Sequence, residues 1–285
     1  MGVALVATSL GALSACGDGP AKRVGGQVAV PPAVRATPVA APAATPIATA
    51  TARTTATPRD TGQSRDKPLS GKVIAIDPGH NGGNAAHPEI IAKPVYIITG
   101  EKECDTTGTE THAGYTEHAF TWDVSQRLKA ILESRGAKVV LTRPNDTGVG
   151  PCINQRAAIA NRAKADAALS VHADGAAESG HGFHIIEPAP IKGHTDKIAK
   201  PSARLALALR AAYHKGTQMP YSNYIGENAL DVRGDLGGLN LSTVPKVFLE
   251  TGNMQNPGDA AKLSDGKFRQ RIAQSLADGF CAYFS

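Results

Sequence analysis

Lys72-Val-Ile-Ala-Ile-Asp-Pro-Gly-His80 is the segment from which the fold of this chain can first be predicted. Its apolar, mostly β-branched residues are typical of a short strand that is buried on both faces of a sheet. The Asp-Pro-Gly sequence ends the strand, because proline cannot donate a ladder hydrogen bond and glycine permits a positive φ. His80 therefore follows the carboxyl end of a buried strand, where open α/β sheets place their ligands. On its own the segment is equally compatible with a surface histidine after an ordinary turn.

Strands and helices alternate along residues 71–285, which are numerous enough to bury a single core. Further strands are predicted over residues 138–142, 167–171, 181–186 and 246–249, and helices over residues 117–135, 154–165, 201–215 and 266–284. This alternation predicts an α/β fold, a three-layer sandwich with a mostly parallel or mixed central sheet flanked by helices.

An export signal is predicted at the amino terminus, over residues 1–16. Residues 2–15 are apolar and uncharged, too short to span a bilayer as a helix but long enough for the core of a signal peptide, although no lysine or arginine precedes them. The run ends in Leu13-Ser-Ala-Cys-Gly17, which resembles a bacterial lipoprotein lipobox with Cys16 as the lipidated residue. The alternative is ordinary cleavage before Cys16, which the large Leu13 disfavours. Both interpretations place the protein in the cell envelope or beyond it, either anchored to the membrane and facing the cell wall or secreted.

Residues 17–70 are predicted to be a disordered tether, rich in alanine, proline and threonine. Such a composition cannot bury enough apolar surface to offset the entropy lost on ordering, and its prolines favour an extended spacer. The tether also carries most of the net charge of +5, because it holds seven basic and three acidic residues. We therefore expect no nucleic-acid-binding face on the folded part, and membrane attachment only through the lipid at Cys16.

Titratable residues follow three predicted strands and open one predicted helix. His80, His172 and Glu250 come at the strand ends, and Glu117 begins the helix. Two histidines and one carboxylate are the ligands of hydrolytic zinc sites, and a further glutamate can act as general base. Spacing alone does not select these four among nine histidines and many carboxylates, because no local His-Glu-x-x-His signature occurs. Asp77 has two possible roles, orienting His80 from behind or shaping the turn.

Five segments, in the same order along the chain, resemble the zinc-dependent N-acetylmuramoyl-L-alanine amidases of the Amidase_3 family. They are Ile76-Asp-Pro-Gly-His80, Gly114-Tyr-Thr-Glu117, Val139-Val-Leu-Thr-Arg143, Ser170-Val-His-Ala-Asp174 and Val244-Pro-Lys-Val-Phe-Leu-Glu-Thr-Gly-Asn-Met-Gln-Asn256. The resemblance covers nearly all of residues 71–285. It implies that they form a catalytic amidase domain with a phosphorylase/hydrolase-like fold.

The resemblance implies that His80, Glu117 and His172 bind one zinc ion and that Glu250 is the catalytic carboxylate. It also implies cleavage of the amide bond between N-acetylmuramic acid and the L-alanine of the peptidoglycan stem peptide. The expected partners are peptidoglycan or muropeptide fragments, and the expected oligomeric state is a monomer. One alternative is a zinc peptidase that acts within the stem peptide, since the same ligands serve carboxypeptidases. The other is a non-catalytic peptidoglycan-binding protein, although such a protein would normally have lost one of the four residues.

Two features depart from the family. Residues 85–114 form a longer connection between His80 and Glu117 than the family leads us to expect, and long connections in compact domains usually have a function. We predict a loop or small hairpin that overhangs the cleft and restricts access to it. Asn253 stands where the family usually has an aromatic residue, which affects the packing behind Glu250.

The cysteines fit an exported protein. If Cys16 is lipidated, three cysteines remain. Cys104 and Cys152 lie in predicted loops, and we predict a disulfide between them that staples residues 85–114 to the domain. Cys281 lies among aromatic residues of the last predicted helix, and we predict a buried free thiol there.

Overall fold

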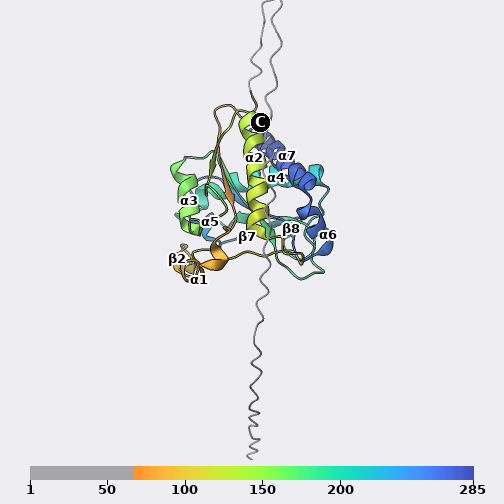
Figure 1. Ribbon diagram of the computed structural model, residues 1–285. Coiled ribbons are helices and arrows are strands. Elements are labelled where there is room, and N and C mark those ends of the chain that lie inside the picture. Colours follow the sequence, from red (N-terminus) through yellow and green to blue (C-terminus); the bar gives the residue numbers. More distant parts are fainter. Residues whose placement is uncertain (1–66) are drawn as a thin grey trace, which may run out of the picture. The chain divides into compact units, whose positions relative to one another are not determined.

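A six-stranded sheet runs through residues 67–285, the part of the chain that the computed structural model describes (Figure 1). The strand order is β4-β1-β5-β8-β6-β7. The strands are β1 (Val73–Pro78), β4 (Lys138–Leu141), β5 (Ala167–Asp174), β6 (His184–Pro188), β7 (Leu230–Arg233) and β8 (Lys246–Asn253). Neighbours among β4, β1, β5 and β8 are parallel, whereas β6 pairs antiparallel with β8 and parallel with β7. The predicted mostly parallel, mixed sheet is therefore confirmed, while the predicted signal peptide and residues 17–66 of the predicted tether lie outside the described residues.

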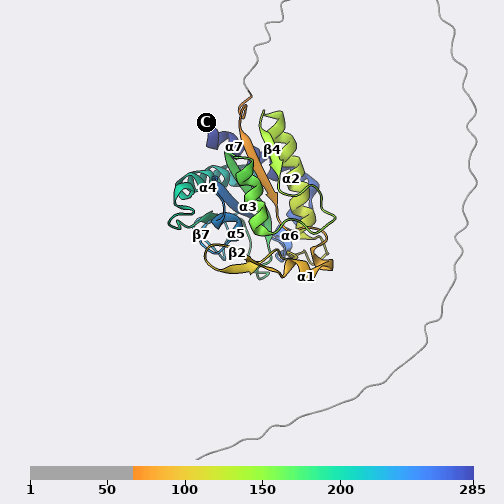
Figure 2. The same cartoon turned by 90° about the vertical axis from the view of Figure 1, so that its left-hand side faces the viewer.

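Helices cover both faces of the sheet, as predicted (Figures 1 and 2). On one face, α2 (Glu117–Ser134), α4 (Asp196–Thr217) and α7 (Gly266–Phe284) contribute large aliphatic and aromatic side chains to the main core. On the other face lie α3 (Ile153–Arg162) and the short α5 (Gly237–Asn240). The core under α3 consists mainly of alanines: Ala75, Ala160, Ala165 and Ala168. Because these side chains are small, the sheet can also place polar residues on this face, such as Ser170 and Lys246.

Two strand boundaries differ from the prediction in a way that matters for the site. β5 and β8 continue beyond residues 171 and 249, so His172 and Glu250 lie within strands rather than after them. The reason is that their parallel ladder extends through the pair His172–Glu250 and resumes at Asp174–Asn253 after an irregularity.

Other boundaries differ because local signals were weak or misleading. The helix predicted to begin at residue 201 begins at Asp196, with Pro201 inside its second turn. The strand predicted over residues 181–186 begins at His184. β7 was not predicted, because it is only four residues long and lies on a partly exposed sheet edge, and α6 (Pro257–Ser264) was also not predicted.

Residues 85–114 contain the predicted small hairpin, formed by β2 (Pro94–Tyr96) and β3 (Glu101–Glu103), preceded by a 3-10 turn (Asn84–Ala86) and α1 (Pro88–Ile91). The predicted disulfide between Cys104 and Cys152 is present and joins the end of the hairpin to the start of α3.

Cys281 is a free thiol, as predicted, but it is only partly buried. It lies one turn from the exposed end of α7, where Arg135 Nη1 donates to its sulfur at 3.3 Å. No helix within residues 67–285 has both the length and the apolar character needed to cross a membrane.

Candidate metal centre

His80, Glu117 and His172, which lie far apart in the sequence, come together at the carboxyl end of the parallel strands. His80 Nε2 lies 3.1 Å from Glu117 Oε2, and His172 Nδ1 lies 2.8 Å from Glu117 Oε1. One possible ligand atom from each residue lies within 4.8 Å of the other two. Two imidazoles and one carboxylate at this spacing fit zinc, and they leave a fourth position for water or substrate.

The tautomer of His80 also fits a metal ligand. Its Nδ1 lies 3.0 Å from the main-chain oxygen of Thr106. Because a carbonyl oxygen only accepts, Nδ1 carries a hydrogen, and Nε2 is the ring nitrogen that can bind a cation once its own proton has left. The Asp-Pro-Gly-His sequence makes this placement possible, since a Cβ atom at Gly79 would collide with the His172 imidazole. His80 itself adopts the left-handed conformation, with φ of 57°.

Main-chain N–H groups fix the carboxylate of Glu117. The N–H of Thr109 donates to Oε2 at 3.0 Å, and the N–H of Ala173 donates to Oε1 at 3.1 Å. Glu117 is also the first residue of α2, where a negative charge is favoured by the helix dipole. The His172 ring is held by stacking on Phe248, with ring centroids 3.9 Å apart and an interplanar angle of 14°.

Glu250 lies beside the three predicted ligands. It is the parallel-ladder partner of His172, so both side chains project from the same face of the sheet. Its Oε2 atom is buried and accepts no hydrogen bond from the described residues. Burying a carboxylate oxygen without a hydrogen-bond partner costs free energy. Its presence next to a ligand cluster indicates that a further group binds in this site.

Burial and neighbouring charges raise the pKa of some groups in the site and lower the pKa of others. Burial disfavours the protonated form of His80, but the carboxylates of Glu117 and Asp105 outweigh this and raise its pKa to about 10. Burial lowers the pKa of His172. Burial, together with the carboxylates of Glu117 and Asp174, raises the pKa of Glu250 well above its usual value. Of the two glutamates in this site, Glu250 is therefore the one that takes up a proton more readily, whereas a proton on His80 must leave before a metal can bind.

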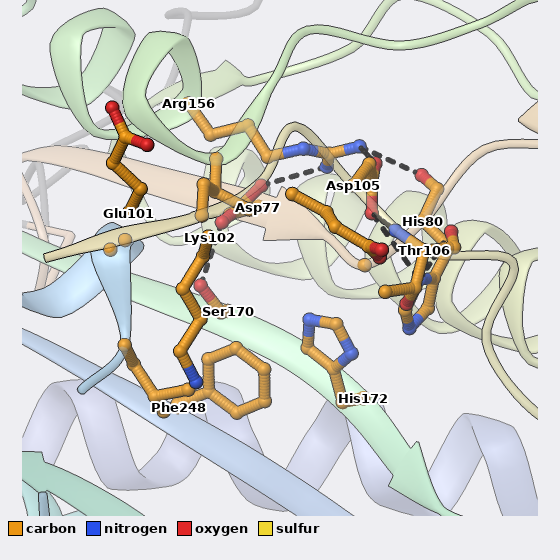
Figure 3. A pocket seen from close by; sticks show the side chains of 16 residues that line it. Asp77, His80, Glu101, Lys102, Asp105, Thr106, Arg156, Ser170, His172 and Phe248 are labelled. Atoms are coloured by element: carbon orange, nitrogen blue, oxygen red, sulfur yellow. Dashed lines mark hydrogen bonds and ion pairs between the residues drawn. The ribbon is translucent and has the colours of Figure 1, made fainter. Parts of the chain in front are cut away.

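Two cavities meet at the predicted ligands His80 and His172. The larger, of about 460 Å³, is bordered by His80, His172, Phe248 and the hairpin residues Glu101, Lys102 and Glu103 (Figure 3). The smaller, of about 300 Å³, is lined by the two histidines, Glu117, Glu250 and the loop of residues 106–109. The connection 85–114 thus supplies part of the walls of both cavities, and its restriction of access to the cleft stays a prediction.

The hairpin is tied to the opposite wall of the larger cavity. Lys102 Nζ lies 3.0 Å from Asp235 Oδ2, and Thr99 Oγ1 donates to the main-chain oxygen of Gly234 at 2.9 Å. The Asn240 side chain donates to the main-chain oxygen of Ile97 at 3.0 Å. These contacts hold β2 and β3 next to α5.

A buried ion cluster that was not predicted lies beneath the larger cavity. Asp77 Oδ2 lies 3.1 Å from Lys246 Nζ, and Asp77 Oδ1 lies 3.0 Å from Arg156 Nη1. Asp77 also accepts from the hydroxyls of Thr142 and Ser170, at 2.6 and 2.7 Å. The partners of its carboxylate do not include the His80 ring, so Asp77 does not orient His80 by direct contact.

Asn253 occupies the position behind Glu250 at which the family usually has an aromatic residue. Its side-chain amide donates to the main-chain oxygens of Ala177 and Gly180, each at 2.8 Å. Its own N–H donates to Asp259 Oδ2 at 3.1 Å. A buried hydrogen-bond network thus replaces aromatic packing at this position.

Comparison with known proteins agrees with the site geometry. Residues 74–282 match the family described as N-acetylmuramoyl-L-alanine amidase. The chain is 40% identical over 218 residues to the N-acetylmuramoyl-L-alanine amidase Rv3717 of Mycobacterium tuberculosis, a match that covers 76% of this chain and 88% of that protein. It also resembles the crystal structures of the N-acetylmuramyl-L-alanine amidases of Mycobacterium smegmatis (37% identity, TM-score 0.71, 76% of this chain and 98% of that chain) and Mycobacterium abscessus (38% identity, TM-score 0.71, 76% and 100%).

Proposed function

Since this chain belongs to the N-acetylmuramoyl-L-alanine amidase family, whose members hydrolyse peptidoglycan, we propose that His80, Glu117 and His172 hold its catalytic zinc ion and that Glu250 is its catalytic carboxylate. The bond cleaved is the amide between N-acetylmuramic acid and the L-alanine of the stem peptide. The observation that carries the proposal is the convergence of the three ligand side chains beside a buried carboxylate with an unpartnered oxygen.

Zinc bound at this site supplies a polarised substrate carbonyl and a water whose pKa is lowered toward neutrality. The proton transfers are carried out by a residue of the chain itself. Glu250 accepts a proton from the attacking water and returns it to the nitrogen of L-alanine as the carbon–nitrogen bond breaks, so that the amine leaves neutral. Its raised pKa, caused by burial and by the carboxylates of Glu117 and Asp174, suits a group that must both gain and release a proton.

The supporting groups keep the ligands in place through each turnover. Hydrogen bonds from the N–H groups of Thr109 and Ala173 hold the Glu117 carboxylate, and the Phe248 ring holds His172 by stacking. Such preorganisation matters because a small displacement of a catalytic group lowers the rate strongly.

Digestion of purified muropeptides, analysed by mass spectrometry with and without a chelator, tests this function. We expect release of intact stem peptides that begin with L-alanine, and loss of this release when zinc is removed. Glu250→Gln should lower kcat by about 100- to 10,000-fold while zinc remains bound, whereas Glu133→Gln, a matched change on the exposed end of α2, should leave kcat unchanged.

Two other results would each support one of the alternatives. Cuts inside the stem peptide would indicate a zinc peptidase, and tight binding of muropeptides without products would indicate a peptidoglycan-binding protein.

We also propose that the domain acts outside the cytoplasm, tethered to the membrane through a lipid on Cys16. The disulfide between Cys104 and Cys152 supports an oxidising compartment, and a peptidoglycan substrate lies there. Labelling with radioactive palmitate tests the anchor, since label that persists in Cys16→Ala would contradict it. Sedimentation of the purified domain tests the proposed monomer.

A further inference from the structure

The loop from Cys104 to Thr109 lies directly against the proposed zinc ligands. The main-chain oxygen of Thr106 accepts from His80 Nδ1 at 3.0 Å, and the N–H of Thr109 donates to Glu117 Oε2 at 3.0 Å. At Gly108, whose φ is 77°, a Cβ atom would lie 2.7 Å from Glu117 Oε2 and 2.8 Å from His80 Cδ2. This loop therefore touches two ligands at once.

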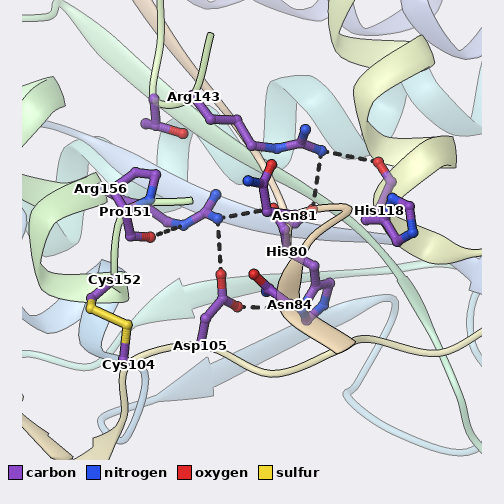
Figure 4. Close-up of polar contacts among 12 residues, drawn as sticks. His80, Asn81, Asn84, Cys104, Asp105, His118, Arg143, Pro151, Cys152 and Arg156 are labelled. Atoms are coloured by element: carbon purple, nitrogen blue, oxygen red, sulfur yellow. Dashed lines mark hydrogen bonds and ion pairs between the residues drawn. A yellow bond between two sulfur atoms is a disulfide. The ribbon is translucent and has the colours of Figure 1, made fainter. Parts of the chain in front are cut away.

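Asp105 connects this loop to His80 in two ways. Its Oδ1 atom lies 3.4 Å from His80 Nδ1, next to the bond that this nitrogen makes to Thr106. Its Oδ2 atom pairs with Arg156 Nη2 at 2.9 Å, and the same Nη2 donates to the main-chain oxygen of His80 at 2.9 Å (Figure 4). The side chains of Asp105 and Arg156 are only 6% and 4% exposed, so water competes little for these contacts.

The disulfide links the two segments that carry this ion pair. Cys104 directly precedes Asp105, and Cys152 directly precedes α3, the helix that carries Arg156. The N–H of Ile153 also donates to the main-chain oxygen of Cys104 at 2.8 Å. Figure 4 shows the sulfur bridge and the ion pair side by side. Without the bridge, the loop would be free to move away from α3, and Asp105 would move with it.

We propose that Asp105 is a positioning residue for the ligand His80 and that the Cys104–Cys152 disulfide keeps Asp105 in place, so that loss of either weakens zinc binding. This inference rests on the proposed role of His80 as a zinc ligand. Partners that orient a ligating histidine through its second nitrogen raise metal affinity, because they fix the ring and its tautomer before the metal arrives. The connection 85–114 therefore acts as a support for the metal site as well as a wall of the cleft.

The test is a competition titration of zinc against a chromophoric chelator, with purified wild-type and variant domains. Asp105→Asn, which keeps the size of the side chain, should bind zinc about 10- to 100-fold more weakly. It should also change the visible spectrum of the Co²⁺-loaded protein, which reports ligand geometry and would not respond to a general loss of stability. Cys104→Ser combined with Cys152→Ser should weaken zinc binding in the same direction.

Two matched controls should leave zinc affinity unchanged. Asp123→Asn removes another carboxylate that pairs with arginines, Arg127 and Arg269, away from the ligands, and Cys281→Ser removes the free thiol. A folded Asp105→Asn with wild-type zinc affinity and an unchanged Co²⁺ spectrum would overturn the inference. If Asp105→Asn does not fold, wild-type zinc affinity in the double cysteine variant would overturn it. A wild-type domain that binds no zinc would instead contradict the proposed function.

Discussion

Replacing Asp77 with asparagine removes the carboxylate on which the buried ion cluster depends. Asp77 is 5% exposed and pairs with Lys246, whose side chain is fully buried, and with Arg156. The asparagine keeps the size of the side chain, but its amide nitrogen cannot accept from a hydroxyl, so one of the two hydroxyl contacts must reverse its direction. It also leaves Lys246 as a buried cation whose carboxylate partner has gone. Arg156 is less affected, because it retains its pairing with Asp105 at 2.9 Å.

Removing one partner of a buried ion pair typically destabilises a protein by about 3–5 kcal/mol. Two cations face Asp77, so we expect Asp77→Asn to lose about 4–5 kcal/mol, which for a domain of this size lowers Tm by roughly 8–20 °C. Lys246→Met should lose less, about 3 kcal/mol, because Asp77 keeps Arg156 and two hydroxyl donors. The double variant should lose less than the sum of the single changes by about 1 kcal/mol or more, since it removes both charges of one pair.

The effect of Asp77 should also depend on pH in a defined direction. Burial alone would raise its pKa, but Lys246 and Arg156 outweigh burial and hold the pKa well below the usual value. A carboxyl group whose pKa is lower in the folded state stabilises that state fully above its unfolded pKa, and loses the contribution as the pH falls through the folded value. The difference between wild type and Asp77→Asn should therefore be constant between about pH 6 and 8 and should shrink below about pH 4.

Urea unfolding of the domain, followed by circular dichroism and by the fluorescence of its single tryptophan, Trp122, measures these differences. Trp122 is a suitable probe because the Arg143 guanidinium, which bonds to the main chain of Pro78, lies 4.9 Å from the centre of its ring. A loss below about 1 kcal/mol in Asp77→Asn would refute the reasoning, because it would mean that the buried charges are relieved by water or by rearrangement. Strict additivity in the double variant would refute the pairing of Asp77 with Lys246.

Three further changes test the site and its walls. Gly79→Ala should abolish stoichiometric zinc binding, measured by metal analysis of the purified protein, because the added methyl collides with His172. Phe248→Ala should weaken zinc binding by several-fold, and less than Asp105→Asn, because it removes the stacking surface of His172 but none of its polar contacts. Shortening residues 95–103 to a tight turn should raise turnover on intact peptidoglycan more than on small muropeptides, and equal turnover on both substrates would argue that the hairpin does not restrict access.

Much of the site could be predicted because its residues are attached to buried strands. Apolar runs identified β1, β5 and β8, and the carboxyl ends of parallel strands meet at one edge of a sheet, so His80, His172 and Glu250 had to lie close together. The choice of these residues among the many histidines and carboxylates required the family resemblance. The disulfide was predictable from the number of cysteines and their position in loops.

The supporting ion pairs could not be predicted, because nothing local marks them. Asp105 and Arg156 are 51 residues apart, and Asp77 and Lys246 are 169 apart, so no periodicity or motif connects either pair. A lysine in an apolar strand instead suggests a side chain at a sheet edge. Lys246 nevertheless lies in the central strand β8, because the alanines under α3 leave room for its side chain to reach Asp77.

Arg156 contributes both to the stability of the fold and to the geometry of the proposed metal site. Its five N–H groups all donate: to the carboxylates of Asp77 and Asp105, and to the main-chain oxygens of Pro78, His80 and Pro151. A lysine offers one nitrogen at this point and cannot reach acceptors on both sides of it. The guanidinium holds the end of β1 and the following left-handed residue against α3, and this conformation directs His80 toward Glu117. The charge that stabilises the cluster beneath the cavity thus also fixes the main chain of the first proposed zinc ligand.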